Sequence, residues 1–168
     1  MELHVHNGVV QREFLETEEI AALKKVDGFY VRFTKKKRAI LVGTLSPIIR
    51  PTELQLYNSI ISRYNISKIL DKDAVLYGVI YGKGVKKQVY DAPTTPIICF
   101  YDLTIADKHP ALADFETICL EKSLPTLSVL YSGPPDKKYE NYLVRFVAET
   151  QILTYENLYR RLHWHSRR

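Results

Sequence analysis

Two adjacent lysines, Lys24 and Lys25, precede an Asp-Gly pair at Asp27 and Gly28, and this spacing could support nucleophilic chemistry. A lysine amine becomes a nucleophile when burial or a neighbouring cation lowers its pKa, and Lys24 is directly beside Lys25 in the chain. Asp-Gly is also a common turn, so the motif taken alone is more typical of a surface lysine before a turn. Other segments must therefore supply a site around the lysine.

The segment KVDGFYVRF resembles the lysine motif of ATP-dependent RNA ligases, in which the lysine attacks the α-phosphate of ATP. Three further segments agree in order. LYGVIYGKGVKKQVYD resembles the family's glycine-containing strand motif, which contacts the nucleotide ribose, and ICFYDL resembles the aromatic-aspartate motif that follows it. LPTLSVLYSGP resembles a stretch common in phage and viral RNA ligases. Together the matches span Leu15 to Pro134. Four short motifs in the expected order imply a nucleotidyltransferase domain, with ATP and Mg²⁺ as cofactors.

The resemblance assigns roles to single residues. It implies that Lys25 is the adenylylated lysine and that Asp27 and Gly28 form the turn that positions it. Tyr101 would stack on the adenine, and its neighbour Asp102 would hold a lysine, a backbone amide or a metal-bound water. The alternative for Tyr101 is an ordinary core aromatic residue on a strand, because this chain has 12 tyrosines.

The next motif of the family has a partial match in the segment ENYLVR, where an asparagine replaces the glycine of the family. The resemblance implies that Glu140 is a metal-associated acid and that Arg145 contacts a phosphate. No residue of this chain is predicted to bind a metal ion directly. A surface strand that carries two charges is the alternative interpretation of the segment.

Two departures weaken the match. Val79 stands where the ligases carry an acidic residue, and Thr154-Tyr155-Glu156 stands where they carry the lysine pair K-x-K. Removing one positioned electrostatic group typically lowers the rate of such a reaction by about 10²–10³. The chain also stops soon after this last motif, so we expect no second region to hold RNA ends.

Several functions therefore stay open. An active protein would transfer AMP from ATP to Lys25 and then to a 5′-phosphate RNA end, in full or weakened form. A non-catalytic relative would bind nucleotide, RNA or a protein partner. If the motif matches are coincidental, the chain is an interaction protein unrelated to ligases.

Basic residues could form a surface that tracks nucleic-acid phosphates. One group is Lys35, Lys36, Lys37 and Arg38, in the charged stretch TKKKR; a second is Lys86 and Lys87; a third is the tail that ends in SRR. Solvated positive loops are the alternative, since these groups are far apart in the sequence.

The elements that must position these residues are predicted from hydrophobic periodicity. The chain has 168 residues, of which 46% are hydrophobic and 26% charged, and it carries a formal net charge of +5. We expect a single α+β domain over residues 1–168, built on antiparallel sheets with flanking helices. The predicted order is a helix-like LETEEIAAL, a hairpin over Asp27–Val42, a helix from Pro51 to Asn65, strands in AVLYGVIYGKG, KQVYD and PIICFYDL, a helix over Pro110–Lys122, strands in TLSVLY and NYLVRFVAE, and a basic helix or tail over 155–168.

Composition excludes other classes. Cys99 and Cys119 are too few for a disulfide framework or a cysteine metal cluster, and no segment approaches the ~20 apolar residues of a membrane helix. The start lacks the pattern of a signal peptide, so we expect a soluble intracellular protein, in the host cytoplasm if it is viral. The histidine pairs near the two ends have no matching zinc partners, and there is no G-x-S-x-G turn. Oligomeric state is not predicted.

Overall fold

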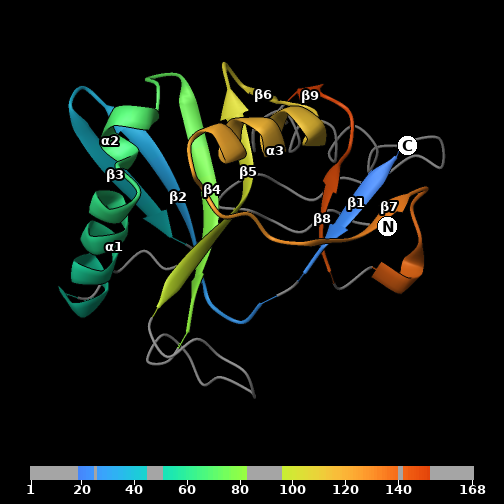
Figure 1. The fold of residues 1–168 in the computed structure, drawn as a ribbon, viewed down its shortest axis with the longest axis horizontal. Helices are drawn as coiled ribbons and strands as arrows, with labels where there is room; N and C mark the ends of the chain where they lie inside the picture. The colour runs from blue at the N-terminus through green and yellow to red at the C-terminus, as the bar shows by residue number, and fades with distance from the viewer. Residues whose placement is uncertain (1–18, 25, 45–50, 83–95, 140–141, 152–168) are drawn as a thin grey trace, which may run out of the picture.

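Two antiparallel sheets organise the protein in the computed structural model, which describes residues 19–24, 26–44, 51–82, 96–139 and 142–151 (Figure 1). The larger sheet has six strands in the order β3-β2-β4-β5-β6-β9, and the smaller has three in the order β7-β1-β8. The strands are β1 (Ile20–Leu23), β2 (Phe29–Lys36), β3 (Ala39–Thr44), β4 (Ala74–Tyr81), β5 (Ile97–Ile105), β6 (Lys108–His109), β7 (Val129–Gly133), β8 (Leu143–Phe146) and β9 (Thr150–Gln151). The helices are α1 (Pro51–Arg63), α2 (Ile66–Ile69), α3 (Leu112–Glu121) and the 3₁₀ turn η1 (Lys137–Tyr139). The predicted α+β class is confirmed.

The predicted hairpin of β2 and β3 is confirmed, and its tip is the basic stretch. Lys36 pairs with Ala39, and Lys37 at the turn has a left-handed φ of 58°. Lys35 Nζ donates a hydrogen bond of 2.8 Å to the carbonyl oxygen of Ser67 in α2. The hairpin tip is therefore fixed against the short helix beside it.

The helices cover one face of the larger sheet. Tyr57 and Ile60 of α1 and Phe115 of α3 are almost fully buried, in one apolar cluster with Phe33 and Phe100 of the sheet. The helices predicted over Pro51–Asn65 and Pro110–Lys122 are confirmed as α1 and α3, with α1 ending before Asn65, whose φ is 54°. No helix among the described residues is long and apolar enough to cross a membrane.

The other face of the larger sheet packs against the smaller sheet. The cluster between them takes Ala21 and Leu23 from β1, Leu143 from β8, and Tyr77, Val79 and Tyr101 from β4 and β5. We call this group the inter-sheet cluster. The protein thus has three layers, with helices, the larger sheet and the smaller sheet in that order.

One predicted element is wrong. The segment LETEEIAAL was expected to be helix-like up to the lysine motif, but Ile20–Leu23 is the central strand of the smaller sheet. All four residues are buried, because β7 and β8 flank the strand and the inter-sheet cluster covers it. A strand that is buried on both faces does not show the alternation of apolar and polar residues that identifies a strand. The two alanines have a high helix propensity, but tertiary packing overrides this propensity here.

Other predictions lie outside the described residues: the strand in KQVYD and the basic helix or tail over 155–168. That residues 1–168 form a single domain stays a prediction. The strand predicted in NYLVRFVAE is confirmed over its centre as β8, whereas the two-residue strands β6 and β9 were not predicted.

Candidate functional site

An irregularity in the pairing of β4 with β5 determines how the candidate residues point. Tyr77 pairs with Asp102 and Gly78 pairs with Phe100, so Tyr101 is an extra residue in β5. In a regular strand neighbouring residues point to opposite faces, and an extra residue interrupts this alternation. Tyr101 and Asp102 consequently both face the smaller sheet, and both are buried.

The ring of Tyr101 is enclosed by other aromatic rings. The ring of Tyr30 meets it edge-on at 5.9 Å between centroids, and that of Tyr77 lies at 6.2 Å. Only 1% of Tyr101 is exposed, and this burial, followed by the nearby charge of Asp102, raises the pKa of its phenol well above the usual value. The phenol therefore stays neutral, and an adenine can stack on the ring only if Tyr30 or Tyr77 moves.

Asp102 is surrounded by partners from its own chain. Its Oδ2 lies 2.6 Å from Nδ1 of His109, its Oδ1 lies 3.2 Å from Nη1 of Arg145, and the same Oδ1 accepts a 2.8 Å bond from the Leu103 amide. Burial alone would raise the pKa of this carboxyl, but the hydrogen bond from His109 and the charge of Arg145 lower it below its ordinary value. The carboxylate is ionised and both its oxygens have internal partners.

Arg145 joins the two sheets at this point. Its Nη2 donates a 2.6 Å hydrogen bond to the carbonyl oxygen of Pro110, and its Nε donates one of 3.1 Å to that of Phe146. Its guanidinium also lies 5.2 Å from the ring centroid of Phe115. The contact from Nη1 to Asp102 lacks the alignment of a hydrogen bond, so the attraction there is ionic. We call Asp102, His109 and Arg145 the buried charge cluster.

Val79 is fully buried within the inter-sheet cluster. Gly28 is next to it, where β2 begins, and a Cβ at Gly28 would overlap the carbonyl oxygen of Ile80 and lie 3.0 Å from Val79 Cγ2. The glycine is thus required for the close approach of two strands. Asp27 beside it is exposed.

The structure brings only part of the predicted site together. Tyr101, Asp102 and Arg145 meet between the sheets, while Lys25 and Glu140 lie outside the described residues, as do Lys86 and Lys87. The carbonyl oxygen of Val26 accepts a 2.9 Å hydrogen bond from the Tyr30 hydroxyl. This bond ties the segment that follows Lys25 to the edge of the inter-sheet cluster.

Three residues of this region were not predicted from the sequence: Tyr30, Tyr77 and His109. The alternation of Tyr77 and Val79 along a strand could have shown that these two residues share one face of the sheet, but no local pattern marks His109. Among the residues that the structure describes, no three His, Cys, Asp or Glu side chains gather closely enough to hold a metal ion.

The fold of this chain, two facing antiparallel sheets with helices outside the larger one, is similar to parts of ATP-dependent ligases among solved structures. No family model matches this sequence, and no curated protein matches it. A Naegleria gruberi RNA ligase, solved as a mutant without ligand, is 12% identical with a TM-score of 0.61, over 91% of this chain and 53% of that chain. An archaeal ATP-dependent RNA ligase is 14% identical with a TM-score of 0.54, over 70% of this chain and 32% of that one.

A third structure, described as a putative ATP-dependent DNA ligase from Aquifex aeolicus, is 13% identical with a TM-score of 0.52, over 74% of this chain and 35% of that one. At these identities the comparison defines the fold alone, so the predicted resemblance to ATP-dependent ligases is confirmed at that level. The chain spans about a third of the archaeal ligase and about half of the Naegleria ligase. The predicted phage or viral character stays a prediction.

Proposed function

We propose that this chain is a ligase-like nucleotidyltransferase module that binds RNA and does not complete AMP transfer. The observation that carries the proposal is the state of Tyr101 and Asp102, the residues that the resemblance assigns to ATP. The ring of Tyr101 is packed against Tyr30 and Tyr77, and the carboxylate of Asp102 is engaged by His109 and Arg145. Both side chains serve the packing of the two sheets.

The described residues at this face of the larger sheet do not fit bound ATP and Mg²⁺. An adenine needs an open face of the Tyr101 ring, and a metal or ribose needs a free carboxylate oxygen. Val79, which stands where the ligases carry an acid, offers only methyl groups and is fully buried. This face therefore lacks the groups that a catalytic step on ATP would need.

One of the Naegleria ligase structures was solved with ATP and manganese, at 14% identity and a TM-score of 0.56 over 70% of this chain and 38% of that one. This relative supports a second candidate function, AMP transfer to Lys25, which would require the inter-sheet cluster to open. The bond between Tyr30 and Val26 favours it specifically, since it holds Val26, the residue that follows Lys25 in the sequence, at the edge of that cluster.

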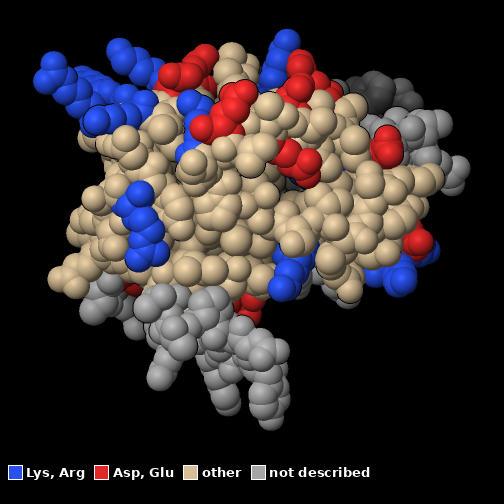
Figure 2. Space-filling view, viewed as in Figure 1, with Lys and Arg blue, Asp and Glu red and all other residues tan. Residues whose placement is uncertain are grey.

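The RNA-binding part of the proposal is based on the hairpin tip. Lys36, Lys37 and Arg38 are exposed there, and none of them forms an ion pair within the part of the chain that the structure describes. Lys68 and Lys72 are exposed on and just after α2, which the Lys35 bond to Ser67 holds beside the tip. Figure 2 shows Lys and Arg side chains gathered at this end of the molecule.

Replacing Lys36 and Lys37 together by alanine should weaken binding to a single-stranded RNA and flatten its salt dependence. The slope of log K against log salt is negative, and each lost phosphate contact reduces its magnitude by about 0.7 for single strands. For two lost contacts we therefore expect a reduction of about 1.4. Fluorescence anisotropy of a labelled oligonucleotide between 50 and 200 mM salt, roughly the range in which such contacts matter, measures both quantities.

The double variant Lys137→Ala/Lys138→Ala is the matched control, because it removes the same charge from η1 in the smaller-sheet region. It should leave the slope unchanged. Equal effects of the two double variants would contradict a binding surface at the hairpin.

Incubation with α-labelled ATP and Mg²⁺ or Mn²⁺ should leave no label on Lys25, because neither an acid at position 79 nor an open Tyr101 ring is present to bind the nucleotide. A denaturing gel and the intact mass measure the adduct, with Lys25→Ala run in parallel. An adduct that disappears in Lys25→Ala would refute the non-catalytic proposal and establish the second candidate function. RNA binding measured on the same preparation shows that the protein is folded.

A further inference from the structure

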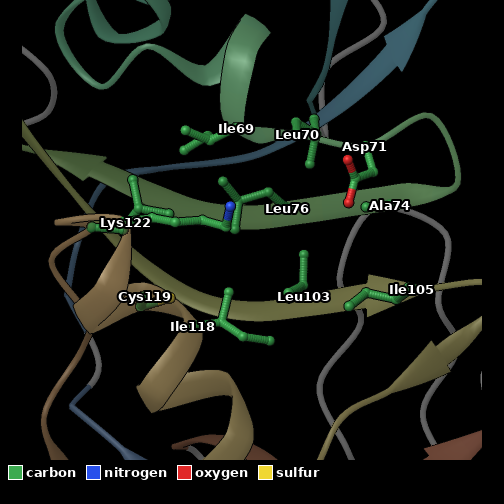
Figure 3. Close-up of a pocket in the computed structure, with 11 residues that line it drawn as sticks. Ile69, Leu70, Asp71, Ala74, Leu76, Leu103, Ile105, Ile118, Cys119 and Lys122 are labelled. Carbon is green, nitrogen blue, oxygen red and sulfur yellow. The ribbon is translucent and has the colours of Figure 1, made fainter.

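A pocket of about 160 Å³ lies on the helical side of the larger sheet, between α2, α3 and the strands β4 and β5 (Figure 3). It is on the opposite face of the sheet from the inter-sheet cluster, since its strand residues Leu76 and Leu103 belong to the apolar cluster under the helices. Nothing in the proposed function uses this pocket.

The walls are almost entirely apolar. Leu70, Leu76, Leu103 and Leu124 are buried at the pocket, and Cys119 closes it from α3. Burial raises the pKa of the Cys119 thiol to about 12, so this wall is uncharged as well. An apolar cavity of about 150 Å³ in another protein stays dry and takes up benzene, so this volume suits one aromatic ring or a branched chain of similar size.

Charge is confined to two exposed residues at the mouth, Lys122 and Asp71. Figure 3 shows the Lys122 side chain reaching over the pocket toward Leu76, whereas the carboxylate of Asp71 lies at the end near Ala74. The group that a seated ligand meets over the apolar walls is therefore a cation.

We propose that this pocket binds a small monocarboxylate, with its apolar body among the leucines of β4 and β5 and its carboxylate at the ammonium of Lys122. Binding removes the apolar body of the ligand from water, and this burial supplies most of the affinity. The ion pair with Lys122 selects an anionic head group over a neutral one. Asp71 opposes the same head group, so it limits the affinity.

The test titrates the full chain, labelled at isoleucine methyl groups, with phenylacetate and separately with toluene. Three isoleucines, Ile69, Ile105 and Ile118, line the pocket, while Ile66 is fully buried in the same helical layer and does not line it. We expect saturable shifts of the three lining methyls by phenylacetate, little shift of Ile66, and weaker binding of toluene.

Variants then separate the two parts of the site. Lys122→Met should weaken the binding of phenylacetate about five-fold, which is the upper range for an exposed ion pair, and should leave the binding of toluene unchanged. Asp71→Asn should strengthen the binding of phenylacetate. Ile118→Phe fills the pocket and should abolish binding of both probes, whereas Leu120→Phe, at a site on α3 that is 81% exposed, should not. The absence of saturable shifts, or equal loss of both probes in Lys122→Met, would overturn the proposal.

Discussion

Replacing Asp102 by alanine is expected to lower the free energy of unfolding by about 3–5 kcal/mol, the range for removing one partner of a buried ion pair. The loss arises because the guanidinium of Arg145 stays buried beside Phe115 with its charge uncompensated. The carbonyl oxygens of Pro110 and Phe146 still accept its hydrogen bonds, but they carry no full charge.

Urea unfolding of the single and double variants measures this effect. In Asp102→Ala/Arg145→Met both charges are absent, so we expect a coupling energy of about 2 kcal/mol between the two sites. Additive losses would show that the two side chains do not act together.

Acid provides an independent readout of the same residue. The folded-state pKa of Asp102 is lowered by His109 and Arg145, so its ionisation contributes stability above the unfolded-state value, roughly pH 4, and this contribution is lost as the pH falls. The natural protein should therefore lose more stability on acidification than Asp102→Ala. Parallel acid profiles of the two proteins would contradict the assignment.

Replacing Val79 by glutamate, which introduces the acid that the ligases carry, is expected to destabilise the protein by about 3–5 kcal/mol. A larger side chain overpacks the inter-sheet cluster by roughly 1–3 kcal/mol, and a carboxyl without hydrogen-bond partners adds about 2 kcal/mol or more. Tyr77 and Tyr101 pack in the same cluster, so the new group has no route to water without separating the sheets.

Val79→Gln is the matched control, since it has the same shape without the charge. Burial raises the pKa of the introduced carboxyl, so Val79→Glu should lose stability relative to Val79→Gln as the pH rises from roughly 4 toward the folded-state pKa. Thermal unfolding at several pH values measures the difference. Equal stability of Val79→Glu and the natural protein at neutral pH would indicate an open, hydrated face and would favour the catalytic candidate.

Much of the fold follows from local pattern. The hairpin, α1, α3, β4 and β5 each have a regular spacing of apolar residues or a turn signal, and each appears where it was predicted. The strand β1 was not predictable in this way, because burial on both sides removes the alternation that identifies a strand. The strands β6 and β9 have two residues each and exist only because they pair with one another and with β5.

The candidate site was less predictable, because it depends on long-range contacts. Tyr101 and Asp102 were identified from a motif, but a regular strand would have pointed them to opposite faces. Both point inward only because Tyr101 is an extra residue between the partners of Tyr77 and Gly78. The partners of Asp102 come from distant elements, with His109 on β6 and Arg145 on β8. Sequence spacing contains no information about such a contact until the sheets are assembled.

The basic hairpin has a further consequence, for the behaviour of the protein at high concentration. Within the described residues β3 pairs only with β2, so it is an edge strand of the larger sheet, and Leu41 on it is 50% exposed. Edge strands can recruit a strand from another molecule, and nearby lysines oppose this by mutual repulsion. We therefore expect the cations at the tip to oppose pairing of β3 with another copy of the chain, and their neutralisation to favour strand-to-strand aggregation.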